Sequence, residues 1–532
     1  MFRGVRVAAV AACGIAAGCS GGGDGGGPID DGGNGGGSGI TYTPGIYAPA
    51  STYAAQCATP RTGTDPATGR AYPDRRGSVA AENFWLRSWT NELYLWYAEV
   101  QDRNPNSYTD PLDYFDLLRT TAVTASGQDK DKFHFTYDSD DWYDLTQSGV
   151  EAGYGIVWYL AAATPPRRII VAYSEPGSPA AAASVTRGAE VLSVDGADAI
   201  NGNTQAIVDT LNAGLFPSAA GESHTLRIRD VNGGERTITL QSANVTSTPV
   251  PTATTISAGG ATVGYLVFHD HIVPSETQLA TAIASLRDAG ATDLILDIRY
   301  NGGGYLDIAS ELAYMIAGPA RTTGATFERI TFNDKYPNTN PVTGQALTPT
   351  GFHTTTQFST PAGQTLPTLN LDRVYILTGS GTCSASEAII NGLRGVGVQV
   401  YQIGNTTCGK PYGFYAFDNC GTTYFSIQFK GTNAQGFGDY TDGFSPSNTT
   451  GVAGTPVPGC AVADDFTRPL GDPQERRLAA ALSFRAGNNL PAACPAPSSV
   501  VPDGVSKSSA PANEEGIIVK SPWRTNRILR DM

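Results

Sequence analysis

The stretch from Tyr375 to Lys410 constrains this chain more than any other part of its sequence. A short apolar run ends in a Gly-rich turn at 378–381, and Ser384 then opens a segment with the capping residues and apolar spacing of a helix. A strand, a tight turn and a helix N-terminus together place a hydroxyl where backbone N–H groups and the helix dipole can meet a developing oxyanion. We therefore interpret Ser384 as the candidate nucleophile and Lys410 as the candidate general base.

A second strand, turn and helix pattern lies upstream. Residues 293–299 form a nearly continuous apolar run that is typical of a buried strand, and Asn301 with three glycines follows directly. A Gly cluster after a buried strand allows unusual backbone angles and a close approach of a ligand to the main chain. On its own, the cluster is explained equally well as a plain tight turn. A helix is expected over 308–316.

Two further units precede this part of the chain. Apolar residues at helical spacing over 82–97 and 111–119 predict a small helical domain, in which the aromatic stripe is expected to pack as core. Residues 148–245 contain strand patterns at 153–160 and 168–173, a helix candidate at 203–215, and a hairpin pattern of residues 224–230 with 235–240. The chain is thus predicted to be a multidomain α/β protein.

The N-terminus predicts export. Positive charge in the first six residues is followed by an apolar run at 7–17 and by small residues immediately before Cys19. This resembles the lipobox of bacterial lipoproteins, with Cys19 as the lipidated residue, and the alternative is an ordinary signal peptide. About 11 apolar residues are too few to span a bilayer, so we expect a lipid anchor, followed by a Gly-rich tether. Ser20 resembles the pattern of outer-membrane lipoproteins.

The charge and the cysteine content indicate which partners, cofactors and disulfides to expect. The formal charge of −14, from 35 basic and 49 acidic residues, disfavours nucleic acid or an anionic membrane surface as a partner. Outside the leader and anchor six cysteines remain, and an oxidising compartment favours disulfides among them. The expected pairs are Cys408 with Cys420 and Cys460 with Cys494. The sequence has no Cys-x-x-Cys pair, so we predict neither a metal nor another cofactor.

Three ordered motifs resemble one family. Asp297-Ile-Arg-Tyr-Asn-Gly-Gly-Gly, Thr382-Cys-Ser-Ala-Ser-Glu and Cys408-Gly-Lys are similar to motifs of the C-terminal processing peptidases, also called tail-specific proteases. The resemblance covers about residues 82–484. It implies a Ser-Lys serine peptidase with a ClpP/crotonase-like catalytic core of repeated ββα units.

The unit at 148–245 resembles a PDZ domain, which binds the C-terminal residues of a peptide at a sheet edge. The loop that would hold the peptide carboxylate consists of Gly153, Tyr154, Gly155 and Ile156. The alternative is a PDZ-like fold that serves only as a spacer.

The resemblance assigns Ser384 as the nucleophile, Lys410 as the base, and the backbone N–H groups of Gly303 and Ala385 as oxyanion donors. An ammonium cannot accept the serine proton, so the pKa of Lys410 must be lowered toward neutrality by burial or a nearby positive charge. Many relatives have a Gln four positions after the Lys, where this chain has Phe414. The group that orients the Lys410 amine is therefore left open.

The neighbours of Ser384 have simpler explanations. Ser386 either lines the site or forms a hydrogen bond at the helix terminus, which we favour. Glu387 is interpreted as a capping-box partner rather than an acid catalyst. Cys383 is not favoured as a nucleophile, because a thiol would need its own activating base.

Polar residues near the two strands leave one rival mechanism. Asp297 and Arg299 are expected to satisfy each other or nearby backbone groups. His269 and His271 alternate along a strand with Asp270 between them, so a Ser-His-Asp triad is the alternative to the Ser-Lys pair.

We therefore predict a lipid-anchored, periplasm-facing serine endopeptidase, expected at the outer membrane, that selects protein substrates by their free C-termini. The alternatives are a catalytically silent peptide-binding scaffold and a His-dependent serine hydrolase of non-peptide esters. The expected domains are a leader at 1–18, a lipidated Cys with a Gly-rich tether and an irregular segment at 19–75, a helical domain at 76–147, a PDZ-like domain at 148–245, a catalytic domain at 246–484 and a low-complexity tail at 485–532.

Overall fold

The computed structural model describes residues 39–66, 68–359, 361–449, 451, 454–495 and 516–519, together with the backbone of 527–528. The predicted leader, the lipidation site at Cys19, and most of the predicted tether and tail lie outside the described residues. Within them, no helix is long and apolar enough to cross a membrane.

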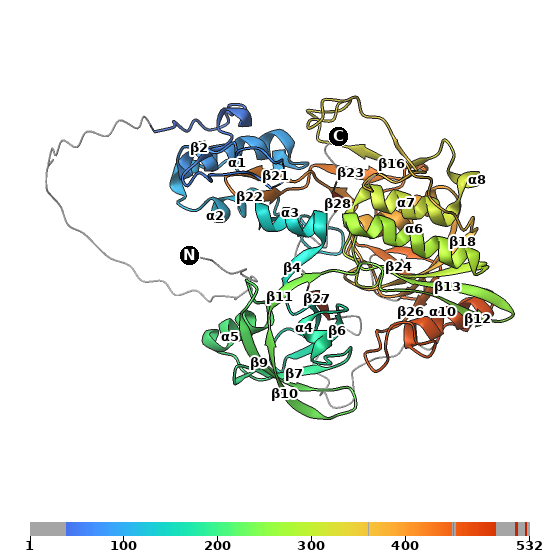
Figure 1. Cartoon of the computed structure of the whole chain (residues 1–532). Coiled ribbons are helices and arrows are strands. Elements are labelled where there is room, and N and C mark those ends of the chain that lie inside the picture. The colour runs from blue at the N-terminus through green and yellow to red at the C-terminus, as the bar shows by residue number, and fades with distance from the viewer. Residues whose placement is uncertain are drawn as a thin grey trace, which may run out of the picture.

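A six-stranded sheet forms the centre of the larger part of the molecule (Figure 1). Its first pair, β12 and β13, is antiparallel, whereas all later neighbours are parallel. In spatial order the strands are β12 (Thr252–Ala258), β13 (Ala261–Val267), β14 (Asp293–Asp297), β18 (Arg373–Thr378), β19 (Gln399–Gly404) and β26 (Gly459–Ala461).

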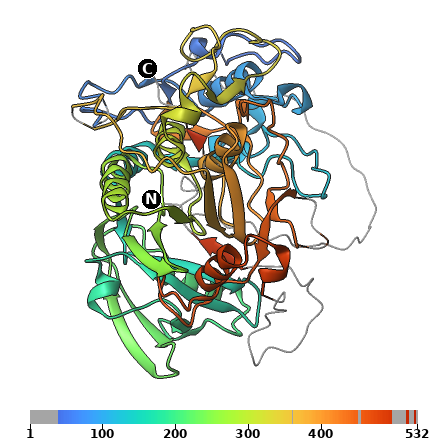
Figure 2. The same ribbon diagram turned by 90° about the vertical axis from the view of Figure 1, so that its right-hand side faces the viewer.

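Helices cover both faces of this sheet, which explains the continuous apolar runs of its strands. Leu294 and Leu296 face the layer of α6 (Val273–Asp288), α7 (Leu306–Ala317) and α9 (Ala385–Gly395). Ile295 points to the opposite face, where α10 (Arg476–Ala486) packs (red in Figure 2). The strand over 293–299 and the helix over 308–316 are thus confirmed with bounds shifted by one or two residues.

The segments that follow three parallel strands lie together at the carboxyl-terminal end of the sheet. β14, β18 and β19 are neighbours and run in the same direction, so their carboxyl ends lie together. The turn at 301–304 follows β14, Ser384 follows β18, and the segment leading to Lys410 follows β19. The topology alone therefore brings the three predicted motifs to one place.

The N-terminal helices are joined to this core rather than standing apart. Ser78 caps α1 (Val79–Leu93), and β3 (Phe135–Asp138) pairs with β22 of the catalytic part. The helix predicted over 111–119 ends at Phe115. The elements of this region are α2 (Pro111–Phe115), α3 (Ser139–Ser148), β1 (Gln56–Cys57), β2 (Arg75–Arg76), and the short 3-10 helices Ala50–Thr52, Tyr97–Glu99 and Pro105–Ser107.

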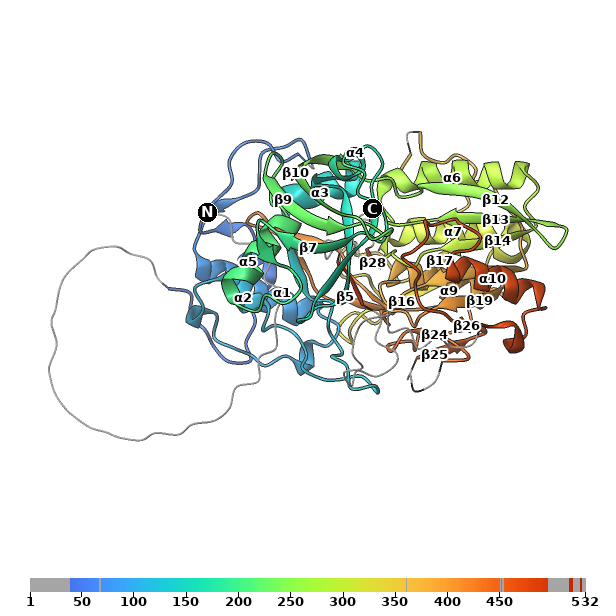
Figure 3. The same ribbon diagram turned by 90° about the horizontal axis from the view of Figure 1, so that it is seen from below.

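A separate β-rich domain, defined here as β4 to β11, lies beside the catalytic core (Figure 3). The predicted helix at 203–215 and the predicted hairpin are confirmed as α5 and as β9 with β10. Its sheet runs β10-β9-β7-β6-β5-β27, and β8 pairs with β7. Its elements are β4 (Val150–Gly153), β5 (Ile156–Ala162), β6 (Arg168–Ser174), α4 (Pro179–Ala182), β7 (Glu190–Val194), β8 (Ala197–Asp198), α5 (Gln205–Leu215), β9 (Ser223–Arg229), β10 (Glu235–Gln241) and β11 (Ala243–Thr246).

Shorter elements complete the molecule. They are β15 (Gly304–Tyr305), α8 (Pro319–Thr322), β16 (Thr326–Thr331), β17 (Thr350–Gly351), β20 (Tyr412–Gly413), β21 (Phe417–Asn419), β22 (Thr422–Phe425), β23 (Phe429–Thr432), β24 (Phe444–Pro446), β25 (Thr455–Val457), the 3-10 helix Pro491–Ala493, β27 (Ile517–Val519) and β28 (Arg527–Ile528).

Three disulfides link the described cysteines, and one predicted pair is wrong. Cys460–Cys494 is confirmed, but Cys420 pairs with Cys57 and Cys408 pairs with Cys383. Cys420 lies at the tip of the β21–β22 hairpin, against the N-terminal segment that carries Cys57. The prediction paired Cys420 with the cysteine nearest to it in the sequence. In the structure, the N-terminal segment that carries Cys57 packs against the β21–β22 turn and supplies the partner instead.

Candidate active site

Ser384 occupies a strained turn between β18 and α9. It is the N-cap residue of α9, with φ of 59° and ψ of −113°, and its side chain is fully buried. A positive φ is uncommon for a residue with a Cβ, and such strain is concentrated at functional sites. The predicted strand, turn and helix start are therefore all present around the candidate nucleophile.

Glu387 connects this turn to the segment that carries Lys410. Its Oε2 accepts the backbone N–H of Ser384 at 2.9 Å and that of Lys410 at 2.8 Å. Its Oε1 accepts from the Gly409 N–H at 2.9 Å and from the Thr407 hydroxyl at 2.5 Å. Burial raises the pKa of the Glu387 carboxyl above its ordinary value, and these donors oppose the shift. The capping role was predicted, whereas the reach to the Lys410 segment was not.

The Cys383–Cys408 disulfide is a second link between the same two segments. One cysteine directly precedes Ser384, and the other lies two residues before Lys410. The bond leaves Cys383 without a thiol, so it cannot act as the nucleophile. In the described part of the chain, Cys383, Glu387 and Cys408 are the group whose ligand atoms lie close enough for a metal. With both sulfurs in a disulfide, this set supplies no thiolate.

The Lys410 side chain is fully buried against aromatic rings. Its Nζ lies 4.7 Å from the ring centroid of Phe133 and 4.7 Å from that of Phe414. Phe414, which departs from the family pattern, therefore contacts the amine directly. Phe133 comes from the N-terminal region, and its place beside Lys410 could not be read from local sequence.

The Asn301–Gly304 turn is held next to Ser384. The Cys383 N–H donates to the Asn301 carbonyl at 3.2 Å, and the Thr382 hydroxyl donates to the Ile298 carbonyl at 2.8 Å. A Cβ at Gly304, whose φ is 133°, would lie 2.3 Å from the His271 carbonyl oxygen. Glycine is therefore required there both by the backbone angle and by the close packing.

The two predicted oxyanion donors differ in their surroundings. The Gly303 N–H donates to Asn301 Oδ1 at 3.0 Å, so an oxyanion would have to replace that acceptor. Ala385 is the first residue of α9 and is buried beside Ser384. Both assignments remain predictions.

His269 and His271 lie in different environments. His271 Nδ1 is 3.0 Å from Asn301 Oδ1, and its backbone N–H donates to the Gly303 carbonyl at 3.1 Å. The His269 ring stacks on Tyr173 of the β-rich domain, with a centroid distance of 4.0 Å. His271 is thus brought to the glycine turn, where its contacts position Asn301.

Ser386 does not form the hydrogen bond that was predicted at the helix terminus. Its buried Oγ has no hydrogen-bond partner among the residues that the structure describes. A buried hydroxyl of this kind two residues after Ser384 agrees better with the alternative, a residue that lines the site.

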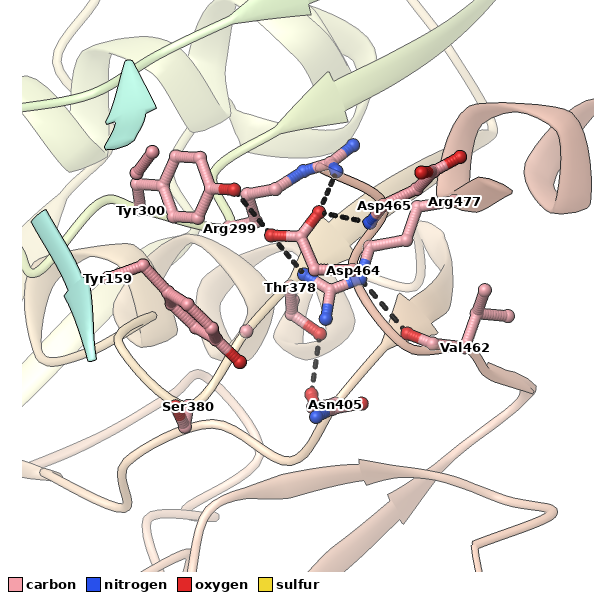
Figure 4. Close-up of polar contacts among 12 residues, drawn as sticks. Tyr159, Arg299, Tyr300, Thr378, Ser380, Asn405, Val462, Asp464, Asp465 and Arg477 are labelled. Carbon is pink, nitrogen blue, oxygen red and sulfur yellow. Dashed lines mark hydrogen bonds and ion pairs between the residues drawn. The ribbon is translucent and has the colours of Figure 1, made fainter. Parts of the chain in front are cut away.

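A buried ion network involves Arg299, two residues before the glycine turn; Figure 4 shows Arg299 together with Asp464 and Arg477. Arg299 contacts Asp297, Asp464 and Glu475 at 2.8 to 2.9 Å, so the predicted pairing of Asp297 with Arg299 is confirmed. Arg187 of the β-rich domain contacts Asp464 at 2.7 Å. Although burial alone would raise the pKa of Asp464, the surrounding arginines hold it well below its ordinary value. This network fixes the β-rich domain against the catalytic core.

The predicted carboxylate-binding loop leads into β5, which lies between β6 and β27 in its sheet. Gly153 ends β4, Tyr154 is buried with its hydroxyl donating to the Gly214 carbonyl, and Ile156 begins β5. Gly155 has a φ of 74°, and a Cβ there would lie 2.4 Å from Ser178 Cβ. The loop is therefore a tight turn that only glycine permits.

Two family models and a curated protein match parts of this chain. Residues 262–414 match the family described as Peptidase family S41, and residues 81–142 match the Peptidase S41 N-terminal domain. A carboxyl-terminal-processing protease from Picosynechococcus sp. is 29% identical over 150 residues. That match spans 26% of this chain and about a third, 32%, of the relative.

One solved structure supports the fold. A structure from Bacteroides fragilis NCTC 9343 assigned as an S41 protease has a TM-score of 0.55 and 23% identity, covering 78% of this chain and 99% of that one. The photosystem II D1 C-terminal processing protease is 19% identical, covering 70% of this chain and 92% of that one. Its TM-score of 0.41 is too low for a detailed comparison.

The fold is mixed α/β, and residues 262–414 are similar to peptidase family S41, a family of serine-type peptidases. Residues 81–142, which precede this match, are similar to the N-terminal domain of the same family.

Proposed function

We propose that this protein is a serine endopeptidase that hydrolyses peptide bonds of cell-envelope proteins through an acyl-enzyme on Ser384. The observation that carries the proposal is the shared Glu387 carboxylate, which accepts the backbone N–H groups of both Ser384 and Lys410. Two residues from separate turns are thereby fixed in one buried site. Positioning of this kind is what nucleophile and base require.

In the proposed reaction, the neutral Lys410 amine takes the Ser384 hydroxyl proton while Oγ attacks the peptide carbonyl carbon. The resulting ammonium then protonates the leaving amine as the C–N bond breaks. Water, deprotonated by the same amine, attacks the acyl-enzyme and releases Ser384. The N–H groups of Ala385 and Gly303 are the proposed donors to the oxyanion.

We propose further that the β-rich domain is a PDZ-like module that selects substrates by their C-termini. The support is β5, which directly follows the Gly153–Ile156 turn and would be the edge of the domain's own sheet without the C-terminal strand β27. A peptide added at this edge would place its carboxylate near the backbone N–H groups of the turn. The leader sequence supports a lipid anchor at Cys19 and a periplasm-facing location, which we propose at the outer membrane.

Peptide cleavage by the wild-type protein, Ser384→Ala and Lys410→Ala tests the proposal. We expect cleavage by the wild type alone, with a preference for peptides with a free rather than an amidated C-terminus. Full activity of Lys410→Ala together with loss in His271→Ala would favour the His-dependent hydrolase instead. Retention of biological activity by Ser384→Ala would favour a binding scaffold.

A further inference from the structure

A C-terminal segment of this chain lies on the edge strand of the β-rich domain. β27 pairs with β5 in antiparallel register, with Ile517 opposite Leu160, Ile518 opposite Tyr159 and Val519 opposite Trp158. Since β5 would otherwise be the end of its sheet, β27 completes that edge. Adding a strand to an exposed edge is a common way in which proteins bind extended peptides.

The side chains of this strand fit the surfaces on both sides. Ile518 packs into the apolar cluster between the two domains, beside Tyr159 and Tyr300, whereas Val519 packs on the core of the β-rich domain. Ile517 is 59% exposed. Ile518 and Val519 thus pack on opposite faces of the strand, as the period-two geometry of a strand requires.

Polar contacts fix the start of the strand close to the catalytic turn. The Gly516 N–H donates to the Tyr159 hydroxyl at 2.8 Å, and the Ser380 hydroxyl donates to the Gly516 carbonyl at 3.4 Å. Ile518 Cβ lies 3.5 Å from the position that a Cβ on Gly381 would take. The segment therefore lies between β5 and the turn that leads to Ser384; Figure 4 shows the Tyr159 and Ser380 side chains that contact Gly516.

β27 runs in the direction expected of a bound peptide whose C-terminus points toward the Gly153–Ile156 turn. Because β27 runs antiparallel to β5, its carboxyl end lies toward the start of β5, which directly follows this turn. The segment thus occupies the surface, and has the orientation, that the proposed function assigns to a substrate C-terminus.

A second contact brings the same end of the chain to the catalytic turn. The backbone of β28 pairs in parallel with β15, where Gly304 lies opposite Arg527 and Tyr305 opposite Ile528. Ser384, Lys410 and the glycines of the turn are buried in this arrangement. A substrate strand would have to displace β28 to pair with β15.

We infer that Gly516–Val519 is an internal ligand of the peptide-binding edge, so that the chain holds its own C-terminal segment in place of a substrate. The inference rests on the proposed function and deepens it. A surface that is open for a fraction of the time binds a peptide with that fraction of its intrinsic affinity. If the segment leaves the edge a tenth of the time, its release should tighten peptide binding about tenfold.

Binding of a labelled peptide with the sequence of residues 513–521 to the full-length Ser384→Ala protein tests this without requiring cleavage. Addition of Ile518→Asp should release the segment and tighten binding about tenfold, measured by fluorescence anisotropy. The matched control is Ile517→Asp, which places the same charge on a residue that is 59% exposed and should have a much smaller effect. Replacing residues 516–519 with Gly-Ser-Gly-Ser tests release without introducing a charge near the buried surface.

Equal affinity of the parent and both released proteins, all with unchanged thermal unfolding, would overturn the inference. So would an equal gain from Ile517→Asp and Ile518→Asp. In proteins that keep Ser384, Ile518→Asp should also raise kcat/KM for peptide cleavage. Tighter binding without cleavage by any active-site-intact protein would support the internal ligand and contradict the peptidase proposal, so the two failures are distinguishable.

Discussion

Replacement of Glu387 by Gln should weaken the positioning of the Ser384 and Lys410 segments, because four donors converge on this buried carboxylate. The Thr407 hydroxyl now donates to Glu387 Oε1 and could instead accept a hydrogen bond from an amide. We therefore expect the NH2 group of the glutamine to take the position of Oε1. The Gly409 N–H then loses its acceptor, at a cost of about 1–3 kcal/mol. The bonds from Ser384 and Lys410 change from a charged to a neutral acceptor and lose about 1 kcal/mol each.

The sum is about 3–5 kcal/mol, divided between folding and catalysis. If half of this free energy is lost from the stabilisation of the transition state, kcat/KM falls about tenfold to sixtyfold. Urea unfolding and peptide cleavage measure the two parts. Thr407→Val removes one donor from the same carboxylate and should cost less in both assays. A Glu387→Gln protein with wild-type unfolding and kcat/KM within about twofold of wild type would refute the role of this carboxylate.

Three further predictions concern other parts of the site. Loss of the Cys383–Cys408 disulfide in a double alanine variant should remove about 3 kcal/mol of stability and lower kcat/KM, and an unchanged kcat/KM would show that the bond does not position the site. Phe133→Leu removes a ring that stabilises the positive charge which Lys410 acquires when it takes the serine proton. We expect a loss of about 1 kcal/mol of transition-state stabilisation, or about fivefold in kcat. An unchanged kcat would contradict this role of the ring. Glu311 of α7 is buried beside Glu276 of α6. Burial, followed by the hydrogen bond and the charge of Glu276, raises the pKa of the Glu311 carboxyl from its ordinary value of 4.5 to about 10. Between these two pH values, the folded protein keeps the Glu311 proton and the unfolded protein loses it. The free energy of unfolding should therefore fall as pH rises through this window, by up to about 1.4 kcal/mol per unit, and urea unfolding of Glu311→Gln should lack that contribution; an identical pH dependence in both proteins would contradict it.

Local sequence predicted the elements of the site well because its strands are buried on both faces. The run at 293–299 and the turn before Ser384 carry continuous apolar patterns and glycines, which depend little on distant parts of the chain. The parallel order of β14, β18 and β19 then brings the motifs together.

What sequence did not predict are contacts between distant segments. Cys57 and Cys420 are 363 positions apart, and no local pattern connects them. Phe133 reaches Lys410 only because the N-terminal region shares a sheet with the catalytic part. The pairing of β27 with β5 likewise depends on tertiary structure, since three apolar residues near a chain end have no specific partner in the sequence.

The central claim is that Ser384 is the nucleophile and that Lys410 activates it. Reaction with a fluorophosphonate, followed by peptide mapping of the adduct by mass spectrometry, tests it most directly. We expect one adduct on Ser384, formed much more slowly in Lys410→Ala and absent from Ser384→Ala. Labelling of Ser386 instead, or a rate that does not depend on Lys410, would contradict the account.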